Sequence, residues 1–370
     1  MYEFIPENPY LLLTPGPLST SKSVRNALLR DWCTWDADYN EDIVQNIRRR
    51  LTALASAARP EDYTVTLMQG SGSFSVEAVL GAAVPQNGKL LIIANGAYGS
   101  RMIKMAKVLK LNFIEYSLIE TEAPKPETVS KILAETPDVT HVALVHCETT
   151  TGILNPLAGI ARAVKEHNKI FILDAMSSFG GIPFDMADHG IDFLVSSSNK
   201  CIQGVPGFAF VIAKREELIK CRGNARSLCL DLYDQWEEMD KSGKWRYTSP
   251  THAVRAFYQA LDDLEAEGGV QARHCRYKEN QRLLAEGMAS LGFQALLSAD
   301  LQSPIITSFL YPRADFDFSA FYRAVKERGF ALYPGKISQA DTFRIGNIGE
   351  VYPQDIKRLV EAVTQMRNEE

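Results

Sequence analysis

The first two thirds of the chain alternate between short apolar runs and longer amphipathic stretches. Runs rich in β-branched and aromatic residues predict strands at 63–68, 89–94, 112–117, 140–146, 170–174, 192–197 and 207–213. Amphipathic patterns predict helices between them at 73–84, 98–110, 126–135 and 156–168. Asn155 followed by Pro156 predicts a capped start for the last helix. Because the strands are almost continuously apolar, we expect an α/β fold with a seven-stranded, mainly parallel sheet covered on both faces.

The pattern changes after about residue 250. Long helical patterns are followed by mixed strands and helices, which predict helices at 250–267, 270–291, 317–328 and 352–367 and strands at 305–310, 330–334 and 342–346. The segment 220–248 reads as irregular. We therefore expect a large domain over 21–250 and a smaller α+β domain over 251–370.

Composition narrows the class of protein. The chain has 370 residues, with 40 basic and 45 acidic side chains and a net charge of −5, which disfavours nucleic acid as a partner. The longest uncharged stretches, 8–21 and 63–76, are shorter than the roughly 20 apolar residues of a membrane helix. The N-terminal residues lack the basic and apolar regions of a signal peptide. These features predict a cytoplasmic, enzyme-sized protein.

Cysteine and histidine positions argue against a metal site. None of the six cysteines forms a CxxC pair, and we expect reduced, mostly buried thiols. His146, Cys147 and Glu148 resemble a ligand cluster, but a third ligand with suitable geometry is missing. The one basic cluster, Arg48–Arg50, is expected to lie on a solvated helix face.

A glycine-serine turn follows the first predicted strand. The sequence from Gly70 to Ser75 reads GSGSFS and opens a predicted helix. Small residues at a helix start let backbone N–H groups approach an anion such as phosphate. The turn does not match a dinucleotide or P-loop motif, because Ser75 replaces the third glycine and no Walker lysine follows. A plain tight turn is the alternative.

Two charged residues follow later strands. Asp174 ends the apolar strand 170–174, where carboxylates face the ligand crevice of α/β proteins, although a helix cap or structural ion pair would also fit. Lys200 follows the next strand and precedes a stretch without charge, 201–213. Apolar surroundings would lower its pKa and make the amine nucleophilic, whereas a lysine reaching solvent is the alternative. Together, a phosphate turn, a strand-end aspartate and a loop lysine suit pyridoxal phosphate.

Motifs along nearly the whole chain support this interpretation. They are Thr14–Pro17, GSGSFSVEA at 70–78, NGAYG at 95–99, HCETTTG at 146–152, SSSNK at 196–200, the region around Thr248–Pro250, and FRIG at 343–346. In combination the chain resembles the class V (fold type I) pyridoxal-phosphate aminotransferases. The resemblance implies that fold, with an N-terminal arm over 1–20 near the active site.

The resemblance also implies roles for individual residues. Lys200 would form the Schiff base with the cofactor, and Asp174 would pair with the pyridinium nitrogen. Tyr98 and Met176 would pack on opposite faces of the ring, and Thr149 would bond near its 3-hydroxyl. The phosphate would be held by Ser71, Gly72, Ser73 and Asn199.

Part of the site is expected from a second subunit. The resemblance implies that Thr248 completes the phosphate site of a partner in a homodimer. Trp245 stands where relatives often have tyrosine, so we expect it near the cofactor with an indole N–H as donor. Arg344 would bind the anionic group of the substrate, with the backbone near Gly16 closing over it.

Two segments narrow the resemblance within the family. Residues 29–36, LRDWCTWD, and 199–211, NKCIQGVPGFAFV, are similar to the subgroup that transfers the amino group of 2-aminoethylphosphonate to pyruvate. That activity gives phosphonoacetaldehyde and L-alanine. An alanine–glyoxylate or serine–pyruvate aminotransferase is the alternative with the same fold and chemistry.

Overall fold

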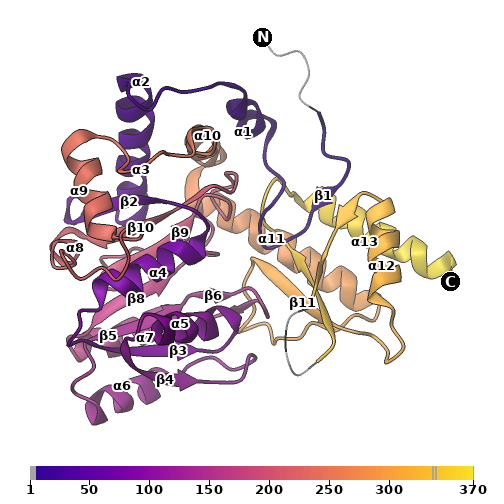
Figure 1. Cartoon of the computed structure of the whole chain (residues 1–370). Coiled ribbons are helices and arrows are strands. Elements are labelled where there is room, and N and C mark those ends of the chain that lie inside the picture. Colours follow the sequence, from indigo (N-terminus) through magenta and orange to yellow (C-terminus); the bar gives the residue numbers. More distant parts are fainter. Residues whose placement is uncertain (1–5, 336, 338–339, 370) are drawn as a thin grey trace.

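The computed structural model describes residues 6–335, 337 and 340–369 (Figure 1). Residues 1–5 of the expected arm, and residues 336, 338–339 and 370 of the expected small domain, lie outside this part of the chain.

A seven-stranded sheet forms the centre of the first part of the chain. Its spatial order is β2-β10-β9-β8-β5-β3-β4. The strands are β2 (Tyr63–Gln69), β3 (Lys89–Ala94), β4 (Asn112–Ser117), β5 (His141–Val145), β8 (Ile170–Asp174), β9 (Phe193–Ser197) and β10 (Phe208–Lys214). β10 pairs antiparallel with both neighbours and thus runs against the other six strands. The seven predicted strands and the mainly parallel sheet are confirmed.

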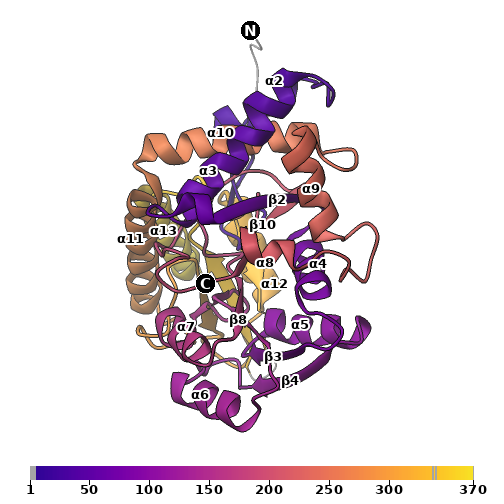
Figure 2. The ribbon, with the colours of Figure 1, turned by 90° about the vertical axis from the view of Figure 1, so that its left-hand side faces the viewer.

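Helices cover both faces of this sheet, as Figure 2 shows for α6 and α7 on one side and α4 and α5 on the other. The first face carries α3 (Asn46–Ala55), α6 (Pro126–Glu135), α7 (Leu157–Glu166) and α10 (Thr251–Glu267). The second carries α4 (Gly72–Ala83), α5 (Ala97–Val108), α8 (Arg215–Ile219) and α9 (Leu232–Ser242). Leu91 and Ile93 of β3 belong to the first apolar core, and Leu90 and Ile92 to the second. This alternation explains why the strands are apolar throughout.

The last third builds a second core around a three-stranded antiparallel sheet, β11-β14-β13. Its elements are α11 (Gly269–Ser290), β11 (Ile306–Leu310), α12 (Phe318–Glu327), β13 (Tyr333–Pro334), β14 (Thr342–Gly346) and α13 (Pro353–Glu369). The predicted strand 330–334 is divided in two. Its first half, β12 (Phe330–Ala331), pairs with β1 (Leu11–Leu12) of the N-terminal segment. The chain start is therefore attached to its last third.

The remaining helices, turns and strands are short. The hairpin of β6 (Cys147–Glu148) and β7 (Ile153–Leu154) follows β5. Near the start lie α1 (Lys22–Asn26), α2 (Ala37–Tyr39), a π-helical stretch at Asn40–Gln45, and 3₁₀ turns at Ala27–Leu29 and Pro60–Asp62. Within residues 6–335, 337 and 340–369, no helix is long and apolar enough to cross a membrane.

The structure corrects two expectations about local structure. The segment 220–248 is not irregular throughout, because α9 occupies 232–242 and buries Leu232, Trp236 and Met239. This i, i+4, i+7 spacing was hidden among acidic residues on the outer face. Asn155 does not cap α7; its amide instead donates to the Val145 carbonyl and exchanges hydrogen bonds with Asn95.

Two expectations about polar side chains are also wrong. Arg48 is not solvated: it is 7% exposed and donates to the main-chain carbonyls of Val65 and Met239. Cysteines are not mostly buried, since three are buried and three, Cys33, Cys229 and Cys275, are exposed. None of the six is in a disulfide.

Candidate active site

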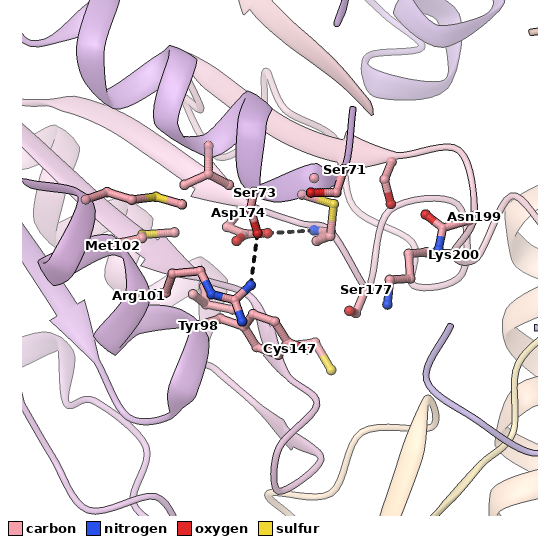
Figure 3. Close-up of a pocket in the computed structure, with 16 residues that line it drawn as sticks. Ser71, Ser73, Tyr98, Arg101, Met102, Cys147, Asp174, Ser177, Asn199 and Lys200 are labelled. Carbon is pink, nitrogen blue, oxygen red and sulfur yellow. Dashed lines mark hydrogen bonds between the residues drawn. The ribbon is translucent and has the colours of Figure 1, made fainter. Parts of the chain in front are cut away.

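A cavity of about 280 Å³ opens at the carboxyl ends of the parallel strands. Its lining includes residues that follow β2, β3, β5, β8 and β9, because strands that run in the same direction end at the same edge of the sheet. Predicted site residues that line it are Ser71, Gly72, Ser73, Tyr98, Asp174, Met176, Asn199 and Lys200. Figure 3 labels six of them, all but Gly72 and Met176. The sheet therefore assembles in one place most of the residues that the motifs singled out.

The glycine-serine turn forms one wall. Ser71 is the N-cap residue of α4, and the helix begins at Gly72. A Cβ atom at Gly72 would lie 2.3 Å from Met176 Sδ and Cε, so only glycine allows Met176 to pack here. The first turn of α4 therefore lies close to Met176 with its N–H groups at the cavity, where an anion would be stabilised.

Asp174 is a buried carboxylate at the end of β8. Its side chain is 5% exposed and accepts a hydrogen bond from the Met176 N–H at 2.9 Å. Among the described residues, no ion pair to Asp174 is found. Burial raises the pKa of Asp174 to about 6, although the Met176 N–H and the charges of Lys200 and Arg101 lower it. A cationic donor placed in the cavity would relieve this cost.

Lys200 lies opposite, in the loop after β9. Its Nζ donates to the Pro15 carbonyl at 2.7 Å. As the apolar surroundings predict, burial lowers the pKa of Lys200, to about 8. Gly16 has a φ of +111°, and a Cβ there would lie 2.8 Å from Lys200 Nζ. The arm therefore passes directly over the lysine, and glycine is required for both its conformation and its closeness.

Contacts from α11 hold the lysine loop from behind. Arg273 is 1% exposed and donates to the Cys201 carbonyl at 2.9 Å, while Gln203 donates to the Tyr277 hydroxyl at 2.7 Å. The Glu267 carboxylate accepts hydrogen bonds from Arg273 and Arg276. Arg276 also donates to the main-chain carbonyls of Gly349 and Val351. The last third of the chain thus fixes the backbone next to Lys200.

Arg344 and Thr149 adjoin the cavity without lining it. Arg344 Nη1 donates to the Thr149 carbonyl at 2.8 Å, and Nε donates to the Pro334 carbonyl at 3.0 Å. Thr149 Oγ1 donates to the Tyr98 hydroxyl at 3.3 Å. Burial lowers the pKa of Arg344, and its charge contributes to the lowered pKa of Lys200. Arg344 therefore acts electrostatically on the same site.

Trp245 and Thr248 lie elsewhere in the chain. Trp245 is buried against Phe208 and lines a different groove, whereas Thr248 is exposed. A single chain does not bring either residue to its own cavity.

Sequence reasoning missed three functional candidates. Arg101 lines the cavity, donates to Ser73 Oγ at 2.9 Å and lies over the Tyr98 ring (Figure 3). Its spacing of three from Tyr98 on a helix was the available signal. Ser197 also lines the cavity, with a buried hydroxyl that has no hydrogen-bond partner among the described residues, and it belongs to the SSSNK motif. Glu148, weighed above as a metal ligand, instead accepts hydrogen bonds from the start of α5. Within the described residues, no group of three or more His, Cys, Asp or Glu could hold a metal ion.

The sequence profile of the family described as "Aminotransferase class-V" matches residues 36–346. The chain belongs to the class-V aminotransferases. It is 61% identical over 358 residues to a 2-aminoethylphosphonate–pyruvate transaminase of Bacteroides fragilis strain YCH46, covering 96% of this chain and 99% of that protein. It is also 61% identical over 359 residues to one of Vibrio vulnificus strain YJ016, covering 96% and 97%.

Solved structures agree on the fold. Pyridoxamine-pyruvate aminotransferase from Mesorhizobium loti superposes with a TM-score of 0.87 at 23% identity, covering 98% of this chain and 93% of that chain. The expected fold type I architecture of a class-V aminotransferase is confirmed.

The donor set of this class-V aminotransferase fits pyridoxal phosphate. The Ser197 hydroxyl is buried without a partner among the residues described, and it lines the same cavity as the helix start at Gly72, where a phosphate would accept hydrogen bonds. Asp174 is a buried carboxylate with no ion pair among the described residues, and a protonated pyridine nitrogen would supply a cationic partner. Lys200 offers an amine with a lowered pKa. Each part of the cofactor thus has a matching group in the cavity.

Proposed function

We propose that this protein is a pyridoxal-phosphate-dependent transaminase that moves the amino group of 2-aminoethylphosphonate to pyruvate, giving phosphonoacetaldehyde and L-alanine. The observation that carries the proposal is the 61% identity, over nearly the whole length of both chains, to proteins with that name. The cavity supplies the groups that such chemistry requires.

The cofactor would be held by the residues at the carboxyl edge of the sheet. Ser71, Gly72, Ser73, Ser197 and Asn199 would hold its phosphate. Tyr98 and Met176 would contact its ring, Thr149 would bond near its 3-hydroxyl, and Asp174 would pair with its ring nitrogen. When bound, pyridoxal phosphate supplies an electron sink for the carbon that loses its proton.

Lys200 is the acid–base residue of the proposed reaction. An amine with a pKa of about 8 is partly neutral near neutral pH, so its Nζ can accept a proton from the amine-bearing carbon of the substrate. The protonated Nζ can return that proton at the neighbouring position. Its contact with the Pro15 carbonyl holds the amine at the cavity wall between these events.

Arg344 is the proposed anchor for the anionic group of both substrates. One N–H on Nη1 and the N–H on Nε donate to two main-chain carbonyls, so among the described residues the other Nη1 hydrogen and both Nη2 hydrogens remain to donate to phosphonate or carboxylate. The backbone at Gly16 would close over the same group. Because both carbonyls are uncharged, an anion is the natural charge partner.

We also propose a homodimer with shared active sites. A groove of about 650 Å³ begins at Gly70 and Phe74, on both sides of the phosphate turn, and continues to Trp245 and Tyr247. Phe74 is 51% exposed, and the Trp245 Nε1–H is buried and has no partner within the described part of the chain. A second copy covering this apolar groove would bring its Thr248 toward the phosphate site.

The six unpaired cysteines support a cytoplasmic location.

Comparing amine donors tests the substrate assignment. Purified protein with pyruvate as acceptor should form alanine much faster from 2-aminoethylphosphonate than from serine. The transfer of the amino group from alanine to glyoxylate is measured alongside, because it is the activity of the alternative aminotransferase. Faster turnover with serine or with alanine and glyoxylate would assign the chain to those aminotransferase activities instead.

Mixing two variants tests the shared site. Lys200→Ala and Thr248→Ala proteins should each be impaired, because each lacks one contribution to a composite site. After subunit exchange, about a quarter of the sites would contain both native residues, so activity should rise above the sum of the two variants. No rise, despite exchange shown by a tagged subunit, would mean that Thr248 does not reach the partner's site.

A further inference from the structure

Glu148 is a buried acidic residue next to the cavity that the proposed chemistry does not use. Burial raises the pKa of Glu148 to about 7, whereas hydrogen bonds from the Gly99 and Tyr98 N–H groups lower it. Its side chain is fully buried, on β6. Its carboxylate accepts hydrogen bonds from the main-chain N–H groups of Gly99, at 2.7 Å, and Tyr98, at 3.2 Å. The Thr150 hydroxyl adds a longer contact of 3.4 Å. The carboxylate thus satisfies two N–H groups in the first turn of α5, where a negative charge is also favoured by the helix dipole.

The space for this carboxylate depends on Gly96. Gly96 precedes α5 with a φ of 175°, which is extended backbone that any residue can adopt. A Cβ atom there would nevertheless lie 2.5 Å from Glu148 Cδ and 2.6 Å from Oε2. The glycine therefore serves the close approach of the carboxylate, not an unusual backbone conformation.

The same hairpin holds Tyr98 at its other end. Thr149, the residue after Glu148, donates from Oγ1 to the Tyr98 hydroxyl at 3.3 Å. The Thr149 carbonyl accepts from Arg344 Nη1 at 2.8 Å. Glu148 therefore contacts the backbone N–H of Tyr98, and the next residue, Thr149, contacts both the Tyr98 hydroxyl and Arg344, the proposed anion anchor.

We propose that Glu148 is a positioning residue that sets the location of the Tyr98 ring in the cavity. The inference rests on the proposed function, in which Tyr98 packs against the cofactor ring. Two main-chain N–H donors on one acceptor group require a carboxylate, because an amide would place its own NH₂ group against one of them. A shift of the α5 start would move Tyr98 and, three residues on, Arg101, which lines the same cavity.

Cofactor affinity measures this positioning directly. Apoprotein of Glu148→Gln, titrated with pyridoxal phosphate and followed by absorbance, should bind about tenfold more weakly than wild type, because one buried N–H loses its acceptor. The matched control is Glu127→Gln, which changes an exposed acid in the first turn of α6 and should bind like wild type. Equal affinity of Glu148→Gln and wild type would overturn the proposal.

A double-mutant cycle separates positioning from a general structural role. Tyr98→Leu removes the ring, so adding Glu148→Gln to it should weaken binding by less than about twofold further. A full tenfold further loss would mean that Glu148 does not act through Tyr98. If Glu148→Gln fails to fold, Gly96→Ala is used instead, because it displaces the carboxylate without removing it. Its cofactor affinity is compared with that of wild type, and its added effect is measured in the Tyr98→Leu background.

Amide hydrogen exchange gives a readout that does not need the cofactor. The peptide that contains residues 96–101 should exchange faster in Glu148→Gln than in wild-type apoprotein, whereas the peptide at the start of α6 should not change. Unchanged exchange at 96–101 would mean that the Glu148 carboxylate does not hold the start of α5. A wild-type protein that fails to bind pyridoxal phosphate would overturn the proposed function, and the exchange result would still decide whether Glu148 holds α5.

Discussion

The two sides of the candidate active site are built differently. On the sheet side, Asp174 and the residues from Ser71 to Ser73 follow directly from strands whose ends meet at one edge. On the other side, Arg344 is held by the Pro334 carbonyl of the neighbouring strand β13 and by the Thr149 carbonyl, which belongs to a distant part of the chain. The first side depends on local strand endings, and the second depends in part on this long-range main-chain contact. The sheet side should therefore tolerate changes in the last third of the chain better than the Arg344 side does.

The largest effect is expected from the residue between the two sides. Lys200→Ala should lower transamination by about 10⁴-fold or more, because both the covalent attachment and the proton carrier are removed. The variant should also lose the visible absorbance of protein-bound pyridoxal phosphate. Lys131→Ala, at an exposed position on α6, is the control and should keep both properties. Retained turnover in Lys200→Ala would assign the proton transfer to another residue.

A change on the sheet side should come next in size. Asp174→Asn should lower kcat by about 10² to 10³-fold, because the ring nitrogen would lose the charge that stabilises its protonated form. Pyridoxal phosphate should still bind, since the phosphate groups are unchanged. Asp188→Asn, at an exposed turn, is the matched control. A normal kcat in Asp174→Asn would show that this carboxylate has only a structural role.

A change on the Arg344 side should affect binding more than the chemical step. Arg344→Ala should raise the KM for both 2-aminoethylphosphonate and pyruvate by about 10²-fold, because a partly desolvated cation for their anionic groups is lost. The two half-reactions are measured separately, and Arg282→Ala on the surface of α11 serves as the control. Impairment of only one half-reaction would contradict a shared anchor.

The smallest predicted effect links the two sides. The rate at which apoprotein takes up pyridoxal phosphate requires neutral Lys200, so it should rise with pH up to about 8 and then level off. Burial is the main cause of the lowered pKa of Lys200, and the charge of Arg344 adds to it. In Arg344→Ala the midpoint should therefore move to higher pH. An unchanged midpoint would mean that the two sides are electrostatically independent.

Periodicity predicted the sheet well because each strand is buried on both faces. The seven runs and the positions of Asp174 and Lys200 after two of them follow from local sequence. Helix α9 was missed because Trp236 and its neighbours lie among acidic residues. Side-chain partners were harder to predict, since Asn155 bonds to Asn95 across the fold instead of capping the nearest helix.

The residues of the candidate site also divide into those that local sequence indicates and those that depend on contacts across the fold. The motifs assigned a role to Tyr98, but none to Arg101 on the same helix or to Glu148 of the HCETTTG motif, since their roles depend on how α5 meets the β6 hairpin. The motifs also named Trp245 and Thr248, which a single chain leaves outside its own cavity. Their predicted roles depend on a second subunit, which no periodicity in one chain can position.

Pairing of β1 with β12 has a consequence for synthesis on the ribosome. The arm that crosses Lys200 at Gly16 is fixed by residues Phe330 and Ala331, which are translated more than 300 residues later. All strands of the large sheet emerge before that point. A nascent chain can thus carry a complete sheet while its arm is undocked, so the wall that the arm adds to the proposed cofactor site forms only near the end of translation.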